Sequence, residues 1–468
     1  MPRPPITAYL AARFAPLLLA ACGSSPTPGP NVLLITVDTL RADHVGAWGY
    51  ERPTTPTIDA LAARGLRFAR ATAPAPWTLP SVASLNTGLS PLTHSLQSPN
   101  DTLPIEAVTL AEILQSRGYT TAGVVSNTLL KPRMGHAQGF DSFYLDEQSD
   151  HASISTPEVT AHAKELLAGF ASSGEPFFLS LLYFDPHYDW RSHGLGFAAP
   201  SAGRIEDNMT IEELRDLAAS GGLSAEECEL LVARYDEEIR FTDAGIAELL
   251  NELARLGLAE DTLVVFVADH GEEFLEHGWL GHTRFLFDGM LHVPLIVLDP
   301  RPDALHGAIV EARVSTISVT PTILDLLDIN PAPWAFDAPS LAPAVRGAEL
   351  VEQPIFSMVN FEAQQRRHLA KSAHLESMIL GDTKYIRPSR QKRGARRGGS
   401  LQRYDLRADP NELAPTVLRR DTPEAQAAER LLDEAIAHFR VRALPHRTAA
   451  YSEAELDQLQ RLGYLGDE

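Results

Sequence analysis

Four segments of this chain share one pattern, an uninterrupted apolar run that ends in polar residues. They span residues 31–38, 120–127, 176–187 and 262–270. Continuous apolar runs of this length are typical of parallel strands that are buried on both faces. Stretches with helical periodicity lie between them, at residues 57–65, 109–118, after Pro157 and at 224–257. This alternation predicts an α/β fold, in which helices flank both faces of a sheet.

The polar residues that close these strands are Asp38, Asn127, His187, Asp269 and His270. Because ligands of such sheets bind beyond the carboxyl ends of the strands, we expect these side chains to share one site, with Asn127 as a substrate-binding residue. The two aspartates and His270 are hard or borderline metal ligands. They predict a site for one divalent ion (Zn, Mn, Ca or Mg) and are also compatible with a second ion.

The segment PAPWTLPSVASLNTG, residues 74–88, contains one candidate nucleophile, Thr78, in a loop broken by three prolines. After Pro80 the sequence predicts a short helix, since Pro has no N–H to lose at a first helical position. A hydroxyl just before a helix start lies near free backbone N–H groups and the positive end of the helix dipole. A deprotonated Thr78 would complete an O,O,O,N ligand set. The alternative for this stretch alone is a loop that only caps a buried helix.

Two further histidines, His277 and His282, follow His270 in the segment ADHGEEFLEHGWLGHT. We expect His187 and His282 to bind a non-bridging oxygen of a substrate or to protonate a leaving group. For His277 we expect an ordinary surface position.

The net charge of −21 argues against a nucleic-acid binder and against general binding to anionic membranes. An anionic substrate would need a local cationic site, such as a metal ion, to overcome this repulsion. The two cysteines, Cys22 and Cys228, exclude a disulfide framework and a cysteine-based zinc site.

The amino terminus carries Arg3 and Arg13, then a short apolar run that ends in LLAAC. This segment resembles a bacterial lipoprotein signal peptide of residues 1–22, with Cys22 as the acylated first residue of the mature chain. Residues 23–30 would be a flexible tether. We therefore expect an exported protein anchored to a membrane through lipidated Cys22. The alternatives are an ordinary signal peptide cleaved nearby and an incidental apolar start.

Beyond residue 346 the pattern changes to short strands and one helix after Pro423, which predicts a smaller C-terminal subdomain with an antiparallel sheet, residues 347–468. Residues 31–346 would form the catalytic domain. The loop RPSRQKRGARRGG has six basic residues, including Arg393 and Arg397. It could attract a polyanionic substrate, but we expect an ordinary solvated loop.

The chain resembles the sulfatase family of the alkaline phosphatase superfamily over nearly its whole mature length. The motifs that carry the resemblance are VLLITVDTLRADHVGAWGY, TTPTIDALAARGLRF, TLAEILQSRGY, YFDPH, YDEEIRFTD, DTLVVFVADHGEEFLEHG, HVPLIV and RLGYL. The family signature, Cys or Ser followed by x-Pro-Ser-Arg and then Thr-Gly, is matched by Pro80, Ser81, Thr87 and Gly88. The resemblance implies a mixed sheet flanked by helices and a metal-dependent in-line displacement. It places Asp38, Asp269 and His270 as metal ligands and His187 and His282 at substrate-binding or acid positions.

The departures from the family pattern bear on the reaction. Thr78 stands where sulfatases have a Cys or Ser that becomes formylglycine, an aldehyde that a methyl-bearing Cβ cannot give. Thr39 replaces a second Asp, Val82 replaces the Arg of the signature, and His282 replaces a Lys. His270 stands where an Asn or Gln is usual. A threonine within an Asp-Thr-Asp-His set looks more like phosphodiesterases and phosphoethanolamine-type transferases of the superfamily.

We therefore expect a metal-dependent ester hydrolase that uses Thr78 as nucleophile and favours small phosphoesters, lipid- or glycan-linked ones included. A sulfated threonine lacks the elimination open to a sulfated formylglycine hydrate, whereas metal-assisted attack of water can hydrolyse a phosphorylated threonine. One alternative is a transferase of a phosphoryl-linked headgroup, although the sequence shows no transmembrane bundle of the kind such enzymes often have. The others are a true sulfatase and a catalytically silent binding protein.

Overall fold

The computed structural model describes residues 29–146, 155–188, 190–199, 201, 203–206, 209–361, 373–389 and 400–461. The predicted signal peptide, with Cys22, lies outside the described residues. The same holds for Arg393 and Arg397 of the basic loop, so both predictions remain untested.

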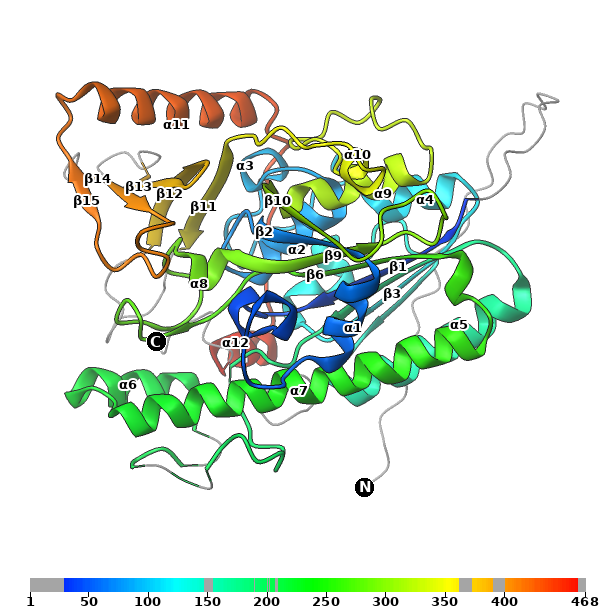
Figure 1. The fold of residues 1–468 in the computed structure, drawn as a ribbon, viewed down its shortest axis with the longest axis horizontal. Coiled ribbons are helices and arrows are strands. Elements are labelled where there is room, and N and C mark those ends of the chain that lie inside the picture. The colour runs from blue at the N-terminus through cyan, green and yellow to red at the C-terminus, as the bar shows by residue number, and fades with distance from the viewer. Residues whose placement is uncertain are drawn as a thin grey trace.

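An eight-stranded mixed sheet forms the centre of the molecule, in the order β10-β2-β9-β6-β1-β5-β3-β4 (Figure 1). The four strands predicted from the apolar runs are neighbours in it and run parallel. They are β6 (Thr262–Ala268), β1 (Asn31–Val37), β5 (Phe177–Tyr183) and β3 (Thr120–Val125). Their carboxyl ends therefore meet at one edge of the sheet, as predicted.

The outer strands make the sheet mixed. β9 (His292–Leu298) runs antiparallel to β6 and to β2 (Leu66–Thr72). β10 (Ala308–Ser315) pairs with β2, and β4 (Ser142–Leu145) with β3, both in parallel. The predicted mixed α/β sheet is confirmed.

Helices cover both faces of this sheet, which explains why the central strands are apolar on both sides. On one face α7 (Ala225–Arg255) packs against α1 (Pro56–Arg64) and α5 (Thr156–Ser173) (Figure 1). On the other, α2 (Thr78–Thr87) packs against α9 (Val319–Leu326) and α4 (Leu110–Ser116). Apart from α11 (Pro423–Val441), which covers the C-terminal sheet, the remaining described helices of at least four residues are α3 (Pro91–His94), α6 (Ile211–Gly221), α8 (Asp288–Leu291), α10 (Ala342–Val345) and α12 (Glu453–Arg461).

The long helix α7 shows how the sequence sets a boundary. Ser224 accepts a hydrogen bond from the backbone N–H of Glu227, whose carboxylate accepts one from the N–H of Ser224. This reciprocal pair satisfies two of the N–H groups that a helix start leaves without intrahelical partners. Among the helices that the structure describes, none has the length and apolar character needed to cross a lipid bilayer.

A separate antiparallel sheet lies after the main one in the chain, as predicted for the C-terminal part. It consists of β11 (Ile355–Phe361), β12 (Ala373–Leu380), β13 (Thr383–Pro388), β14 (Leu401–Asp405) and β15 (Thr416–Leu418). Helix α11 (Pro423–Val441) lies across it, over a second apolar core that includes Met358, Met378 and Leu432 (Figure 1).

This second sheet supports the loop that leads to Thr78. The backbone N–H of Met358 on β11 donates to the carbonyl of Pro74 at 2.9 Å. The hydroxyl of Ser357 donates to the carbonyl of Ala73 at 2.8 Å, and the Trp77 and Phe361 rings pack edge to face. The C-terminal sheet therefore fixes the segment before α2.

Candidate active site

Three predicted metal ligands converge at the carboxyl ends of β1 and β6. The two strands pair in register up to Val37 and Ala268, so Asp38 and Asp269 come next as neighbours. One ligand atom from each of Asp38, Asp269 and His270 lies within 4.8 Å of the other two, and all three residues are fully buried. Parallel pairing alone brings these distant positions together.

Thr78 lies in this cluster, at the start of α2. Its hydroxyl oxygen is 3.3 Å from Oδ2 of Asp38 and 3.3 Å from Nε2 of His270. The helix begins at Thr78, not after Pro80 as the sequence predicted. Pro80 fits inside the first turn because the N–H groups there have no intrahelical partners to lose. The hydroxyl therefore belongs to the first turn, where the helix dipole favours negative charge.

Asn127 positions the aspartate and the threonine. Its side-chain amide donates to Oδ2 of Asp38 at 2.8 Å and lies 3.4 Å from the Thr78 hydroxyl, while its oxygen accepts from the N–H of Leu129 at 2.9 Å. We predicted Asn127 to bind substrate. The structure places it at the site, with its amide directed at Asp38.

His270 presents its Nε2 nitrogen to the cluster. Its Nδ1 lies 2.9 Å from the carbonyl of Gly271, which can only accept, so Nδ1 carries the proton. Nε2 lies 3.4 Å from the Asp38 carboxylate and 3.5 Å from that of Asp269. It donates to them while the ring is protonated, and it can serve as a ligand once a cation replaces that proton. A hydrogen bond on the far nitrogen commonly orients a metal-ligating histidine in this way.

The two carboxylate oxygens of Asp269 differ: one accepts backbone hydrogen bonds and the other faces the cluster. Its Oδ1 accepts from the backbone N–H groups of His270 at 2.8 Å and Thr39 at 3.3 Å. Its Oδ2 is buried and has no hydrogen-bond partner among the residues that the structure places. A buried oxygen without a hydrogen-bond partner lowers the stability of the fold, unless another group or an ion binds it.

The buried carboxylates of the cluster repel each other, and a cation between them would reduce this repulsion. Burial and the charge of Asp38 raise the pKa of Asp269 to about 8. Burial lowers the pKa of His270, but the charges of Asp269 and Asp38 outweigh it and raise that pKa to about 9. Burial also raises the pKa of Asp38, yet the hydrogen bond from His270 and nearby His187 leave it lowered. Two carboxylates, one of which has an oxygen without a described partner, and an imidazole nitrogen that can give up its proton fit a divalent ion.

His187 and His282 form a histidine wall next to the cluster. The His282 ring centroid is 4.8 Å from that of His187 and 4.7 Å from that of His270. Nδ1 of His282 lies 3.1 Å from a carboxylate oxygen of Glu272. Burial, with the charges of His270 and His187, lowers the pKa of His282 well below its ordinary value. The structure thus brings both predicted histidines to the site.

Two other strand-end or loop residues have structural roles. Asp185 caps α5, because its carboxylate accepts hydrogen bonds from the N–H groups of Ser155 and Thr156. His277 is partly buried, contrary to the predicted surface position, and its Nδ1 lies 2.9 Å from the Glu273 carboxylate. Neither joins the cluster.

Sequence reasoning missed the residues that hold the loop after β1. The Tyr235 hydroxyl donates to the carbonyl of Thr39 at 2.7 Å and accepts from the N–H of Arg41 at 3.0 Å. Thr39, which replaces the family's second Asp, has a left-handed backbone with φ 55° and uses its N–H to support Asp269. Glu272 was also missed, although it lies only two residues after His270.

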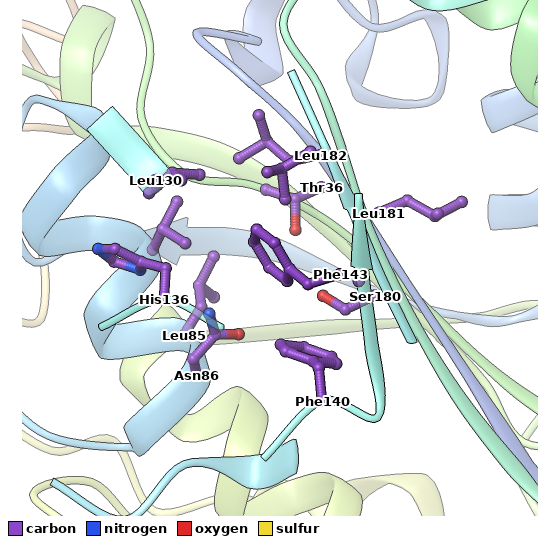
Figure 2. Close-up of a pocket in the computed structure, with 13 residues that line it drawn as sticks. Thr36, Leu85, Asn86, Leu130, His136, Phe140, Phe143, Ser180, Leu181 and Leu182 are labelled. Atoms are coloured by element: carbon purple, nitrogen blue, oxygen red, sulfur yellow. The ribbon is translucent and has the colours of Figure 1, made fainter. Parts of the chain in front are cut away.

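Val82, which replaces the signature arginine, lies one turn after Thr78 and faces a cavity. This cavity of about 20 Å³ lies between α2 and the sheet, and Leu85, His136 and Phe140 also line it (Figure 2). The position therefore brings no positive charge to the cluster.

Comparisons with known proteins identify the family of this chain. A Sulfatase family model matches residues 30–329. The chain belongs to the sulfatase family. It is 28% identical over 326 residues to an ulvan-active sulfatase of Formosa agariphila, covering 64% of this chain and 62% of that relative. It is 26% identical over 389 residues to human arylsulfatase A, covering 71% and 70%.

Solved structures share the fold. A 2-O GAG sulfatase superposes with a TM-score of 0.70 at 21% identity, covering 90% of this chain and 95% of the other. A phosphonate monoester hydrolase of Agrobacterium radiobacter superposes with a TM-score of 0.67 at 23% identity, covering 91% and 98%. The sulfatase/alkaline phosphatase fold predicted from the sequence is confirmed.

Proposed function

We propose that this sulfatase-family protein is a metal-dependent phosphoester hydrolase with Thr78 as its nucleophile. The observation that carries the proposal is the position of the Thr78 hydroxyl, 3.3 Å from both Asp38 and His270 inside the ligand cluster. An oxygen so placed can serve as a ligand and as a nucleophile.

The ion would be held by Asp38, Asp269, His270 and the Thr78 oxygen. When bound, a divalent ion lowers the pKa of the threonine hydroxyl and offsets charge on the attacked group. Asn127 keeps Asp38 oriented through its 2.8 Å hydrogen bond, and the first turn of α2 favours a negatively charged oxygen at Thr78. Oxygen and imidazole ligands suit Zn, Mn, Ca or Mg to different degrees.

The reaction proceeds in two displacements. The deprotonated Thr78 oxygen attacks phosphorus while the bond to the leaving oxygen breaks, and the leaving group takes a proton from His187 or His282. Water then attacks the phosphothreonine, gives up a proton to the same histidine and releases phosphate, which restores the deprotonated Thr78 oxygen.

Phosphate is favoured over sulfate because the two covalent intermediates differ in how they can be broken down. A sulfated threonine has no elimination route, while a phosphorylated threonine is open to in-line attack by water. The absence of positive charge at Val82 leaves the metal as the principal cation at the reacting group. Sulfate-ester hydrolysis is the second candidate, because relatives such as the ulvan-active sulfatase carry that activity in their names. A glycan-linked substrate is suggested by the same names.

The deciding experiment compares three substrates: 4-nitrophenyl phosphate, bis(4-nitrophenyl) phosphate and 4-nitrophenyl sulfate. We expect the metal-loaded protein to cleave a phosphoester faster than the sulfate, and Thr78→Ala to lower kcat on the order of a thousandfold. Thr87→Ala is the matched control, since that hydroxyl lies at the other end of the helix, where it donates to the carbonyl of Ala83 and accepts from the N–H of Leu89. Sulfate turnover faster than that of any phosphoester, and lost in Thr78→Ala, would establish a sulfatase instead.

A further inference from the structure

Two arginines gather on one tryptophan beside the histidine wall. The guanidinium carbon of Arg215, on α6, lies 4.3 Å from the ring centroid of Trp279, and that of Arg284 lies 4.6 Å from it. The indole N–H of Trp279 donates to the carbonyl of His282 at 3.1 Å. This hydrogen bond fixes the tryptophan, and with it both arginines, to the loop that carries His282.

Arg215 is held in a defined orientation. Its Nε donates to the carbonyl of Leu280 at 2.8 Å. Gly281 has φ +102°, and a Cβ at this position would lie 2.4 Å from Nη2 of Arg215. The positive φ favours glycine at Gly281, and a Cβ at this position would push the Arg215 guanidinium out of its present place.

Arg215 is also connected to the reaction centre through an aromatic ring. Its guanidinium lies 5.7 Å from the ring centroid of Tyr188, and this ring stacks on His282 with a centroid separation of 4.8 Å. The two arginines therefore flank the side of the site where His282 would meet a leaving group.

Neither arginine forms an ion pair within the part of the chain that the structure describes. Glu212 and Glu272 are close enough to stabilise the charge of Arg215, while Arg284 opposes it. In a chain with 61 acidic and 40 basic residues, two guanidinium groups that share one tryptophan ring and form no ion pair in the described part of the chain are a specific feature. A bound anion would supply the missing counter-charge, through bidentate hydrogen bonds of the kind that guanidinium groups form.

We propose that Arg215 and Arg284, stacked on Trp279, form a second anion-binding subsite that recognises a negatively charged group on the leaving portion of the substrate. The inference rests on the proposed ester hydrolysis and extends it. The preferred substrates are esters whose leaving group carries a carboxylate or a second phosphate or sulfate, as acidic glycans do.

The test uses two esters that differ only in the second charge, phenyl phosphate and 4-carboxyphenyl phosphate, together with the corresponding pair of sulfates. The measured quantity is the ratio of kcat/KM for the carboxylated over the plain ester, in each variant relative to the unaltered protein. We expect Arg215→Gln to lower this ratio on the order of tenfold, and Arg284→Gln to lower it as well. Comparing ratios cancels the electronic effect of the carboxylate on the leaving group.

Arg67→Gln is the matched control. Arg67 also stacks on a tryptophan, Trp48, at 5.1 Å, but it lies on β2, two strands away from β6. Its loss should leave the ratio as it is. A ratio that stays constant in both Arg215→Gln and Arg284→Gln would overturn the proposal, as would an equal loss on both esters, because Arg215 would then only support the fold.

The subsite can be tested even if the proposed hydrolysis fails. Should neither ester pair be cleaved, binding of phenylphosphonate and 4-carboxyphenylphosphonate to the metal-loaded protein is measured by calorimetry. Tighter binding of the carboxylated compound that is lost in Arg215→Gln supports the subsite. Equal binding of the two compounds by the unaltered protein overturns it.

Discussion

The hydroxyl of Thr78 lies 3.3 Å from Nε2 of His270, although 192 residues separate them in the chain. One residue begins a helix and the other comes just after the end of a buried strand, so both sit on rigid elements. The C-terminal sheet adds a third support, through the hydrogen bond between Met358 and Pro74. Placement on rigid elements favours a preorganised site, in which little reorganisation precedes the reaction.

The first prediction concerns the metal. Chelator-treated protein should rebind at least one divalent ion per chain, and Asp269→Ala should weaken that binding at least on the order of a hundredfold, because it removes the orphan oxygen. Elemental analysis and calorimetry measure both quantities. Asp299→Asn is the matched control, since Asp299 is equally buried but pairs with Arg301 beyond the end of β9, which runs antiparallel to β6. A folded, active protein without metal would contradict the assignment.

The second prediction concerns covalent catalysis. Thr78→Ser should keep kcat within about tenfold, since the hydroxyl survives, and acid-quenched reactions should show a phosphorylated peptide at residue 78. Mass spectrometry of the quenched protein detects the added phosphoryl group. Finding this group on another residue, or an unmodified chain in a burst phase, would exclude Thr78 as the nucleophile.

The sequence predicted the centre of the sheet better than its edge. The central strands are uninterrupted apolar runs, and the rule that parallel strands expose their carboxyl ends together was enough to assemble Asp38, Asp269 and His270. Strand β2 escaped prediction because Arg67 and Arg70 interrupt its apolar pattern. Tyr235 lies within α7, and nothing in a helical pattern shows that its hydroxyl will hold a loop distant in sequence.

The third prediction concerns Val82. Restoring the family arginine, Val82→Arg, should destabilise the protein on the order of 3 kcal/mol, because a guanidinium would enter a cavity of about 20 Å³ that has no acidic residue among its described lining residues. Urea unfolding measures the loss. Val82→Ile, which adds one methylene to the same cavity, should stay close to the original stability. Unaltered stability of Val82→Arg, with gained sulfate turnover, would contradict this picture of the position.

The fourth prediction concerns export, which the described residues leave untested. We propose that Cys22 is lipidated, so that Cys22→Ala or globomycin should block incorporation of labelled fatty acid and leave unprocessed precursor. Cys228→Ala is the control, because Cys228 is half-buried in α7. A mature chain that begins well past residue 22 without an acyl group would show an ordinary signal peptide.

The fifth prediction concerns acid sensitivity and rests on His136, which lines the cavity under α2 (Figure 2). Both ring nitrogens of His136 are buried without a hydrogen-bond partner among the described residues, and burial lowers its pKa from 6.5 to about 4. The unfolded chain therefore binds this proton more tightly than the folded one. The contribution to stability is complete above pH 6.5 and is lost as the pH falls toward 4, and the loss amounts to about 2 kcal/mol at pH 5.

His136→Met removes this linkage and places a flexible apolar side chain beside the cavity. The free energy of unfolding should therefore fall less between pH 7.5 and pH 5 in this variant than in the unaltered protein, by about 2 kcal/mol. His306→Met, at an exposed histidine, should retain the full pH dependence. Urea unfolding at both pH values measures the difference. Equal losses in His136→Met and His306→Met would show that His136 is protonated as easily in the folded protein as in the unfolded chain.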